Sequence, residues 1–102
     1  MPDSSTQQAC FTKADLSLET PKMVRVVLLN DNYTTMEFVV WVLQNIFAKS
    51  HDEAVKITLE VHQNGKGICG IYPYDIGESK TQETILAAEQ AKFPLKVFTE
   101  SI

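Results

Sequence analysis

The sequence has little cysteine, no excess of positive charge and no long hydrophobic run. Its two cysteines, Cys10 and Cys69, are too few for a disulfide-rich secreted scaffold or a structural zinc cluster. Its 9 basic and 13 acidic residues give a formal net charge of −4, which argues against a general attraction to nucleic acid or to an anionic membrane. No apolar run has the length of about 20 residues that crosses a bilayer. We therefore expect a cytoplasmic protein with no cofactor, no metal, no nucleic-acid partner and no membrane partner.

One domain accounts for the sequence from residue 22 onward. The chain has 102 residues, of which 44% are hydrophobic, and this is enough for one hydrophobic core. Residues 1–21 are mostly polar, show no apolar period and lack the pattern of a secretory signal. We predict that residues 1–21 form a disordered N-terminal extension, which either frays or engages a partner, and that residues 22–102 form the core domain.

Apolar patterning predicts the element order β-α-α-β-α-β. The first strand, residues 22–29, is rich in branched apolar side chains and stops at three turn-forming residues. Capping boxes at Thr34–Glu37 and Ser50–Glu53 predict two helices, the first of which ends near Lys49. A strand, a third helix that starts at Asp75 and a last strand follow. The fold class is therefore α+β, with a small three-stranded antiparallel sheet packed against three helices.

The first predicted helix is apolar on more than one side. Besides its main apolar stripe it carries Phe38, Trp41 and Val42 at helical spacing, which is more apolar surface than one core contact requires. Either this helix is sandwiched between other elements, or part of its surface lines a pocket or a partner site.

Three polar residues interrupt this apolar pattern. Asn30 and Asp31 lie where the first strand leads into the first helix, and His62 lies on an apolar helix face. A lone histidine in that place is ordinarily a hydrogen-bonded residue at the edge of the core. Together, however, the three side chains near surplus apolar surface would suit a cation that carries a hydrophobic arm. No catalytic residue is expected, because the pattern offers no nucleophile except threonines and no second carboxylate.

The run of residues 30–39, NDNYTTMEFV, resembles the signature of the ClpS family. ClpS proteins are small adaptors that pass N-degron substrates to the Clp unfoldase–protease. The resemblance covers residues 22–102 in the same order. It continues through Val61-His62, Gly65-Lys66, Ile68-Cys69-Gly70 and Phe93-Pro94-Leu95.

The resemblance implies a monomeric adaptor, not an enzyme, that binds proteins beginning with Leu, Phe, Tyr or Trp. It implies that Asn30, Asp31 and His62 hold the free α-amino group. The side-chain pocket that it implies is formed by Thr34, Met36, Val39, Val42, Thr58, Val61 and Leu95. The adaptor would then dock on the N-domain of a Clp AAA+ unfoldase, ClpA or ClpC, through Tyr33, Asp75 and Lys80.

The sequence departs from the family pattern at several positions. Asn32 replaces a frequent second Asp, and Thr35 replaces a common Pro. Thr58 stands where a long apolar residue contributes to the pocket, so the change either enlarges the cavity or alters the ranking of Leu against aromatic residues. Asp75 is shorter than the usual Glu. Trp41 replaces a polar residue and forms either an added surface patch or a lid over a neighbouring side chain.

Two other functions are compatible with the sequence pattern. One is a protein-interaction module without a pocket, which would show no cavity between Asn30 and His62. The other is a small enzyme that uses His62 and Asp31 as an acid–base pair.

Overall fold

The structure, a computed structural model, describes residues 21–102. The predicted disordered extension, residues 1–21, lies outside the described residues except for Pro21. The elements follow the predicted order. They are β1 Met23–Leu29, α2 Met36–Asn45, α3 His51–Asn64, β2 Lys66–Pro73, α4 Tyr74–Ala91 and β3 Lys96–Ser101. No helix among these described residues is both long and apolar enough to cross a bilayer.

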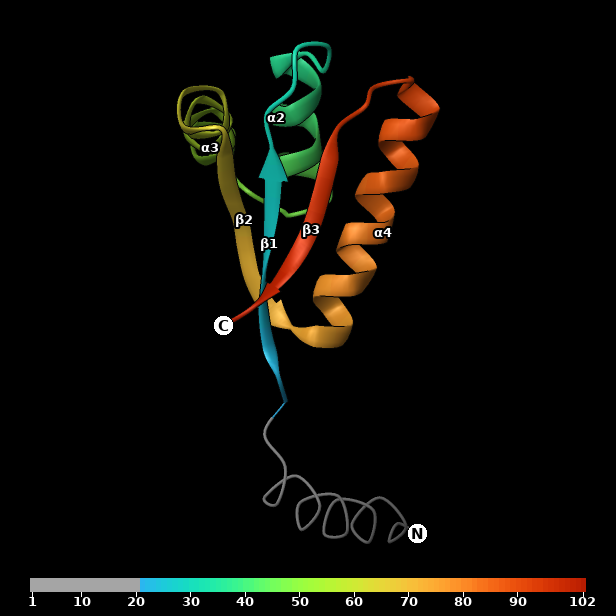
Figure 1. The fold of residues 1–102 in the computed structure, drawn as a ribbon. Coiled ribbons are helices and arrows are strands. Elements are labelled where there is room, and N and C mark those ends of the chain that lie inside the picture. Colours follow the sequence, from blue (N-terminus) through green and yellow to red (C-terminus); the bar gives the residue numbers. More distant parts are fainter. Residues whose placement is uncertain (1–20) are drawn as a thin grey trace, which may run out of the picture.

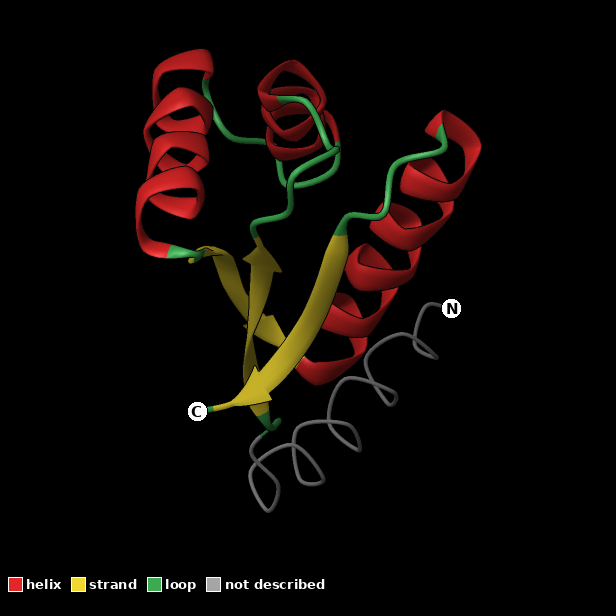
Figure 2. Ribbon diagram, turned by 45° about the horizontal axis from the view of Figure 1, so that its top comes forward, coloured by secondary structure: helices red, strands yellow, loops and turns green. Residues whose placement is uncertain are grey.

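The three strands form one antiparallel sheet in the order β2-β1-β3, so the first strand is central (Figure 1). Val27 of β1 lies opposite Ile68 of β2 on one side and opposite Phe98 of β3 on the other. Helices α2 and α3 lie near the end of the sheet where β1 stops, and α4 runs alongside β3 (Figures 1 and 2). The loop after β1 therefore enters a region enclosed by two helices.

The core lies between the helices and one face of the sheet. Val26, Leu28 and Cys69 are fully buried there, whereas Ile68 and Phe98 on the opposite face remain exposed. The two outer strands thus alternate as strands with one covered face do, whereas Val27 of the central strand, which lies between Ile68 and Phe98, is also buried. Burial raises the pKa of Cys69 to about 12, so this cysteine is a core residue and not a reactive thiolate. The predicted α+β class, with a three-stranded antiparallel sheet and three helices, is confirmed.

Helix α2 begins later than the capping box predicted. Its N-cap is Thr35, whose hydroxyl accepts a hydrogen bond from the backbone N–H of Phe38 at 3.1 Å. Thr34, the predicted cap, donates its hydroxyl to the Asp31 carboxylate at 2.7 Å. The prediction was wrong because a side chain of the preceding loop competes for Thr34.

Helix α2 also ends earlier than predicted, at Asn45 and not near Lys49. The chain turns through Ala48, which has a φ of 56°, and the backbone N–H of Lys49 donates to the Leu43 carbonyl at 2.9 Å. This turn leaves Ser50 as the N-cap of α3, as predicted.

Helix α4 begins at Tyr74 and not at Asp75. Pro73 occupies the N-cap position, where it makes no side-chain cap hydrogen bond. Asp75 therefore lies in the first turn, where its negative charge is favourable to the helix dipole.

Candidate functional site

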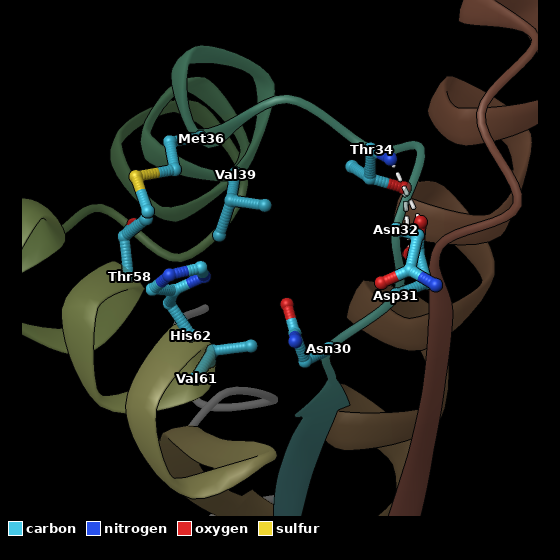
Figure 3. A pocket seen from close by; sticks show the side chains of 9 residues that line it. All are labelled: Asn30, Asp31, Asn32, Thr34, Met36, Val39, Thr58, Val61 and His62. Carbon is cyan, nitrogen blue, oxygen red and sulfur yellow. Dashed lines mark hydrogen bonds between the residues drawn. The ribbon is translucent and has the colours of Figure 1, made fainter.

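A cavity of about 250 Å³ lies where the end of β1 meets α2 and α3 (Figure 3). Its walls come from the loop after β1 at one end and from the two helices at the other. The lining residues are Asn30, Asp31, Asn32, Thr34, Met36, Val39, Thr58, Val61 and His62.

A backbone hydrogen bond holds the end of β1 against the end of α3. The N–H of Asn30 donates to the carbonyl of Gly65 at 2.9 Å. Gly65 is the C-cap of α3 with a φ of 88°, a left-handed conformation that glycine adopts without strain. His62 lies in the last turn of the same helix, so the bond brings Asn30 and His62 to one cavity. In Figure 3 the exposed Asn30 side chain stands between His62 and Asp31.

The Asp31 carboxylate organises the loop between β1 and α2. One of its oxygens accepts hydrogen bonds from the backbone N–H groups of Tyr33 and Thr34, at 2.8 and 2.7 Å. The other oxygen accepts the Thr34 hydroxyl at 2.7 Å. Partial burial acts to raise the pKa of Asp31, but the hydrogen bonds from Thr34 and Tyr33 outweigh it and lower the pKa from its ordinary value of 3.8. Asp31 therefore places a negative charge at this end of the cavity at neutral pH.

The opposite end of the cavity is apolar. Val39 and Val61 are nearly fully buried, whereas Met36 in the first turn of α2 is 43% exposed. The Thr58 hydroxyl donates to the Ala54 carbonyl at 2.7 Å, so its polar group is satisfied within α3. The cavity thus joins an acceptor-lined, negatively charged end to an apolar end, an arrangement that suits a cation with a hydrophobic group attached.

The cavity contains every residue predicted for the amine site and the side-chain pocket except Val42 and Leu95. These two side chains lie in the core, with 0% and 7% of their surface exposed. The cavity also includes Asn32, to which sequence reasoning gave no role in the site. The signal for Asn32 was its position next to Asp31 in a turn-forming run.

The three residues predicted to contact an unfoldase have different surroundings. Tyr33, in the loop after β1, is 76% exposed, and Asp75 is exposed in the first turn of α4. Lys80 is partly buried, and its Nζ donates to the Ile46 carbonyl at 2.8 Å. The same amine lies over two aromatic rings, at 6.0 and 5.5 Å from their centroids. Sequence reasoning missed these internal contacts of Lys80.

Neither alternative function gains support from this geometry. The oxygens of Asp31 accept hydrogen bonds from their own loop, and no hydrogen bond within residues 21–102 joins Asp31 to His62. The pocketless interaction module is contradicted by the cavity between Asn30 and His62. In this described part of the chain, no three His, Cys, Asp or Glu side chains cluster as metal ligands would.

Helix α2 carries a second apolar surface outside the cavity, formed by Phe38 and Trp41. Trp41 is 47% exposed, and its ring is stacked on that of Phe38 with centroids 6.0 Å apart. Both rings line an open depression together with Ala87, Gln90 and Ala91 of α4. The extra apolar surface of α2 therefore serves two purposes: one side of the helix lines the cavity, and another side lines this depression together with α4. Trp41 is a half-exposed surface residue that covers Phe38.

Known proteins resemble this chain over most of its length. Residues 19–98 match the family model of the ATP-dependent Clp protease adaptor protein ClpS. The ClpS adapter protein of Helicobacter hepaticus is 52% identical over 91 residues, which are 89% of this chain and 92% of that protein. That of Wolinella succinogenes is 47% identical over 88 residues, 86% of each chain. The structure of Agrobacterium tumefaciens ClpS2 bound to L-phenylalaninamide superposes with a TM-score of 0.78 at 36% identity, over 81% of this chain and 100% of that chain.

Proposed function

This chain belongs to the ClpS family of ATP-dependent Clp protease adaptor proteins, and we propose that its cavity binds the first residue of proteins that begin with Leu, Phe, Tyr or Trp. As an adaptor it is not an enzyme, and it serves protein degradation by the Clp protease. One observation carries the proposal: the cavity joins hydrogen-bond acceptors and a carboxylate at one end to an apolar surface at the other.

The polar end of the cavity is the site for the free α-amino group of the substrate. This group is a cation at neutral pH. Asn30, Asp31 and His62 all line the cavity, with Asn30 between the other two (Figure 3), and Asp31 supplies the opposite charge. Hydrogen bonds to charged groups contribute about 1.5–3 kcal/mol each. Acetylation of the amine removes its charge and two of its three N–H donors, so the site is selective for a free N-terminus.

The apolar end of the cavity takes the side chain of the first residue. Met36, Val39, Thr58 and Val61 line it, whereas Val42 and Leu95 support it indirectly from the core. Thr34, predicted for the same pocket, lines the cavity beside Asp31 at the polar end (Figure 3). Full burial of a Leu or Phe side chain contributes roughly 1.5–3 kcal/mol. Together with two or three hydrogen bonds to the amine, this burial gives a binding free energy compatible with micromolar affinity, about −8 kcal/mol. This holds provided that little entropy is lost when the peptide and the site become ordered.

Delivery needs a second surface that meets the N-domain of the unfoldase, ClpA or ClpC. We assign this contact to Asp75 and Lys80 on α4 and to Tyr33. Tyr33 and Asp75 have exposed side chains but lie at opposite ends of β1, so a partner that meets both would have to span the length of the sheet (Figure 1). Residues 1–21 assist the handover of the substrate. We further propose that the adaptor acts as a monomer and that it works in the cytoplasm together with its Clp partner.

Calorimetric titration with short free-amine peptides that differ only in their first residue tests the proposal. Peptides that start with Leu, Phe, Tyr or Trp should bind about 10- to 150-fold more tightly than one that starts with Asp, because only they bury an apolar side chain. A Leu-initiated reporter protein should also be degraded faster by a Clp unfoldase–protease when this adaptor is added. Equal affinity for all first residues would overturn the proposal.

A further inference from the structure

Thr58 presents a short apolar surface to the cavity. In Figure 3, Thr58 and Met36 lie at one end of the cavity and Asp31 and Asn32 at the other. Thr58 is 4% exposed, and its hydroxyl donates to the Ala54 carbonyl of its own helix at 2.7 Å. Because Cβ of threonine carries only a hydroxyl and a methyl group, the group left to face the cavity is the γ-methyl.

The space in front of this methyl group decides which side chains fill the cavity. An apolar cavity of roughly 150 Å³ holds a benzene molecule. The cavity here has about 250 Å³, including its polar end. A phenyl or indole ring therefore fits together with the amine, whereas the smaller side chain of leucine leaves space unfilled. Atoms that line an unfilled space lose their dispersion contacts on that side.

Met36 favours aromatic side chains in the same cavity. It lines the cavity and is 43% exposed, so its flexible thioether is accessible to a bound side chain. Methionine sulfur makes favourable contacts with aromatic rings that an aliphatic side chain cannot offer. The volume and the chemistry of the lining thus favour the same ligands.

From these observations we propose that Thr58 is a specificity-determining residue of this chain, and that by keeping the apolar end of the cavity open it ranks Trp and Phe above Leu as the first residue. This inference rests on the proposed function, since it assumes that the cavity binds the first residue of a substrate.

Titration with three free-amine peptides that start with Trp, Phe or Leu tests the inference. The unmodified protein should bind the Trp and Phe peptides several-fold more tightly than the Leu peptide. Thr58→Met extends a longer side chain into the cavity and should lower the affinity for the Trp peptide at least tenfold relative to the Leu peptide. A single methylene in an apolar pocket changes discrimination by about 10- to 200-fold. Thr58→Leu should act in the same direction and replaces Thr58→Met if that variant does not fold.

Thr58→Val is the matched control. It keeps the shape of the side chain and removes only the hydroxyl, while the Ala54 carbonyl retains the backbone hydrogen bond of α3. The ranking of the three peptides should therefore change less than twofold. A ranking changed as strongly by Thr58→Val as by Thr58→Met would overturn the inference, because the hydroxyl and not the volume would then decide.

The inference and the proposed function fail in distinguishable ways. If the unmodified protein binds the Leu peptide as tightly as the Trp peptide, or if Thr58→Met weakens all three peptides by the same factor, the ranking by Thr58 is overturned and first-residue binding stands. If no free-amine peptide binds to the unmodified protein, the proposed function itself is overturned.

Discussion

At the scale of single residues, Asp31 gives the cavity both its shape and its charge. The hydrogen bonds that its carboxylate accepts from Tyr33 and Thr34 fix the loop that leads into α2. The same bonds lower its pKa and keep it ionised. The residue that we propose to meet the substrate amine is therefore already oriented before any ligand binds.

Asp31→Asn should weaken binding of a Phe-initiated peptide about 10- to 150-fold, the factor for one charged hydrogen bond of about 1.5–3 kcal/mol. Asparagine keeps an oxygen for the N–H groups of the loop, so the main loss is the negative charge. Calorimetric titration measures the effect. Asp52→Asn makes the same charge change in the first turn of α3, outside the cavity, and should leave the affinity within about twofold. If both variants lost the same factor in peptide affinity, the net charge of the protein would explain the loss, and a direct contact between Asp31 and the amine would be contradicted.

The same variant should also reveal the lowered pKa of Asp31. A carboxyl group with a lower pKa in the folded state stabilises the fold above its unfolded pKa near 3.8, and this contribution disappears as the pH falls through the folded value. The free energy of unfolding should therefore be higher for the unmodified protein than for Asp31→Asn at neutral pH, and the difference should shrink below about pH 4. Urea unfolding of both proteins at neutral pH and below pH 4 measures this difference in free energy. A difference that does not change with pH would contradict a lowered pKa of Asp31.

The place of individual residues could be predicted only in part. Asn30, Asp31 and His62 could be predicted to lie together because polar side chains stand out against an apolar pattern. Val42 and Leu95 could not be separated from the lining residues, because apolar side chains look the same in sequence whether they face the core or a cavity. Only the tertiary packing, of α2 for Val42 and of the segment before β3 for Leu95, places the two in the core.

At the scale of secondary-structure elements, Lys80 joins α4 to the end of α2. Its amine donates to the Ile46 carbonyl, one of the carbonyls that a helix leaves unpaired at its C-terminus. A cation in that place also opposes the negative end of the helix dipole. Because the first turns of α2 carry Met36 and Val39 of the cavity, Lys80 helps to fix one wall of the site from the other end of the helix.

Lys80→Met should lower the free energy of unfolding by about 1–2 kcal/mol, because it keeps the aliphatic stem and removes the hydrogen bond to the Ile46 carbonyl. Urea unfolding followed by the fluorescence of Trp41, the one tryptophan of the sequence, measures the change. Lys96→Met, at an exposed position of β3, should shift the same value by no more than about 0.5 kcal/mol. If Lys80→Met matched the unmodified protein in stability, Lys80 would have no structural role and would be available to a partner alone.

The existence of the elements could be predicted, but their ends could not. Thr34 and Thr35 are equally suitable N-caps by residue type, and the choice falls on Thr35 because Asp31 binds Thr34. The end of α2 likewise depends on the turn at Ala48. The residues at which a helix begins and ends depend on such local hydrogen bonds, which cannot be predicted from apolar periodicity.

At the scale of the whole molecule, the hydrophobic content of 44% is not all core. Part of it lines the cavity beside α2 and α3, and part remains exposed, as at Trp41 and Phe98. The chain has a net charge of −4, and Asp31 places one of its negative charges at the cavity. An acidic chain with an apolar recess is suited to a cationic, hydrophobic ligand and ill suited to nucleic acid.

The most direct measurement is calorimetric titration of this adaptor with two peptides of one Phe-initiated sequence, one with a free N-terminus and one acetylated. We predict micromolar affinity for the free peptide and an affinity at least about 100-fold lower for the acetylated peptide. Acetylation removes the positive charge and two of the three N–H donors from which Asn30, Asp31 and His62 would accept hydrogen bonds. Equal affinity for the two peptides would contradict recognition of the N-terminus.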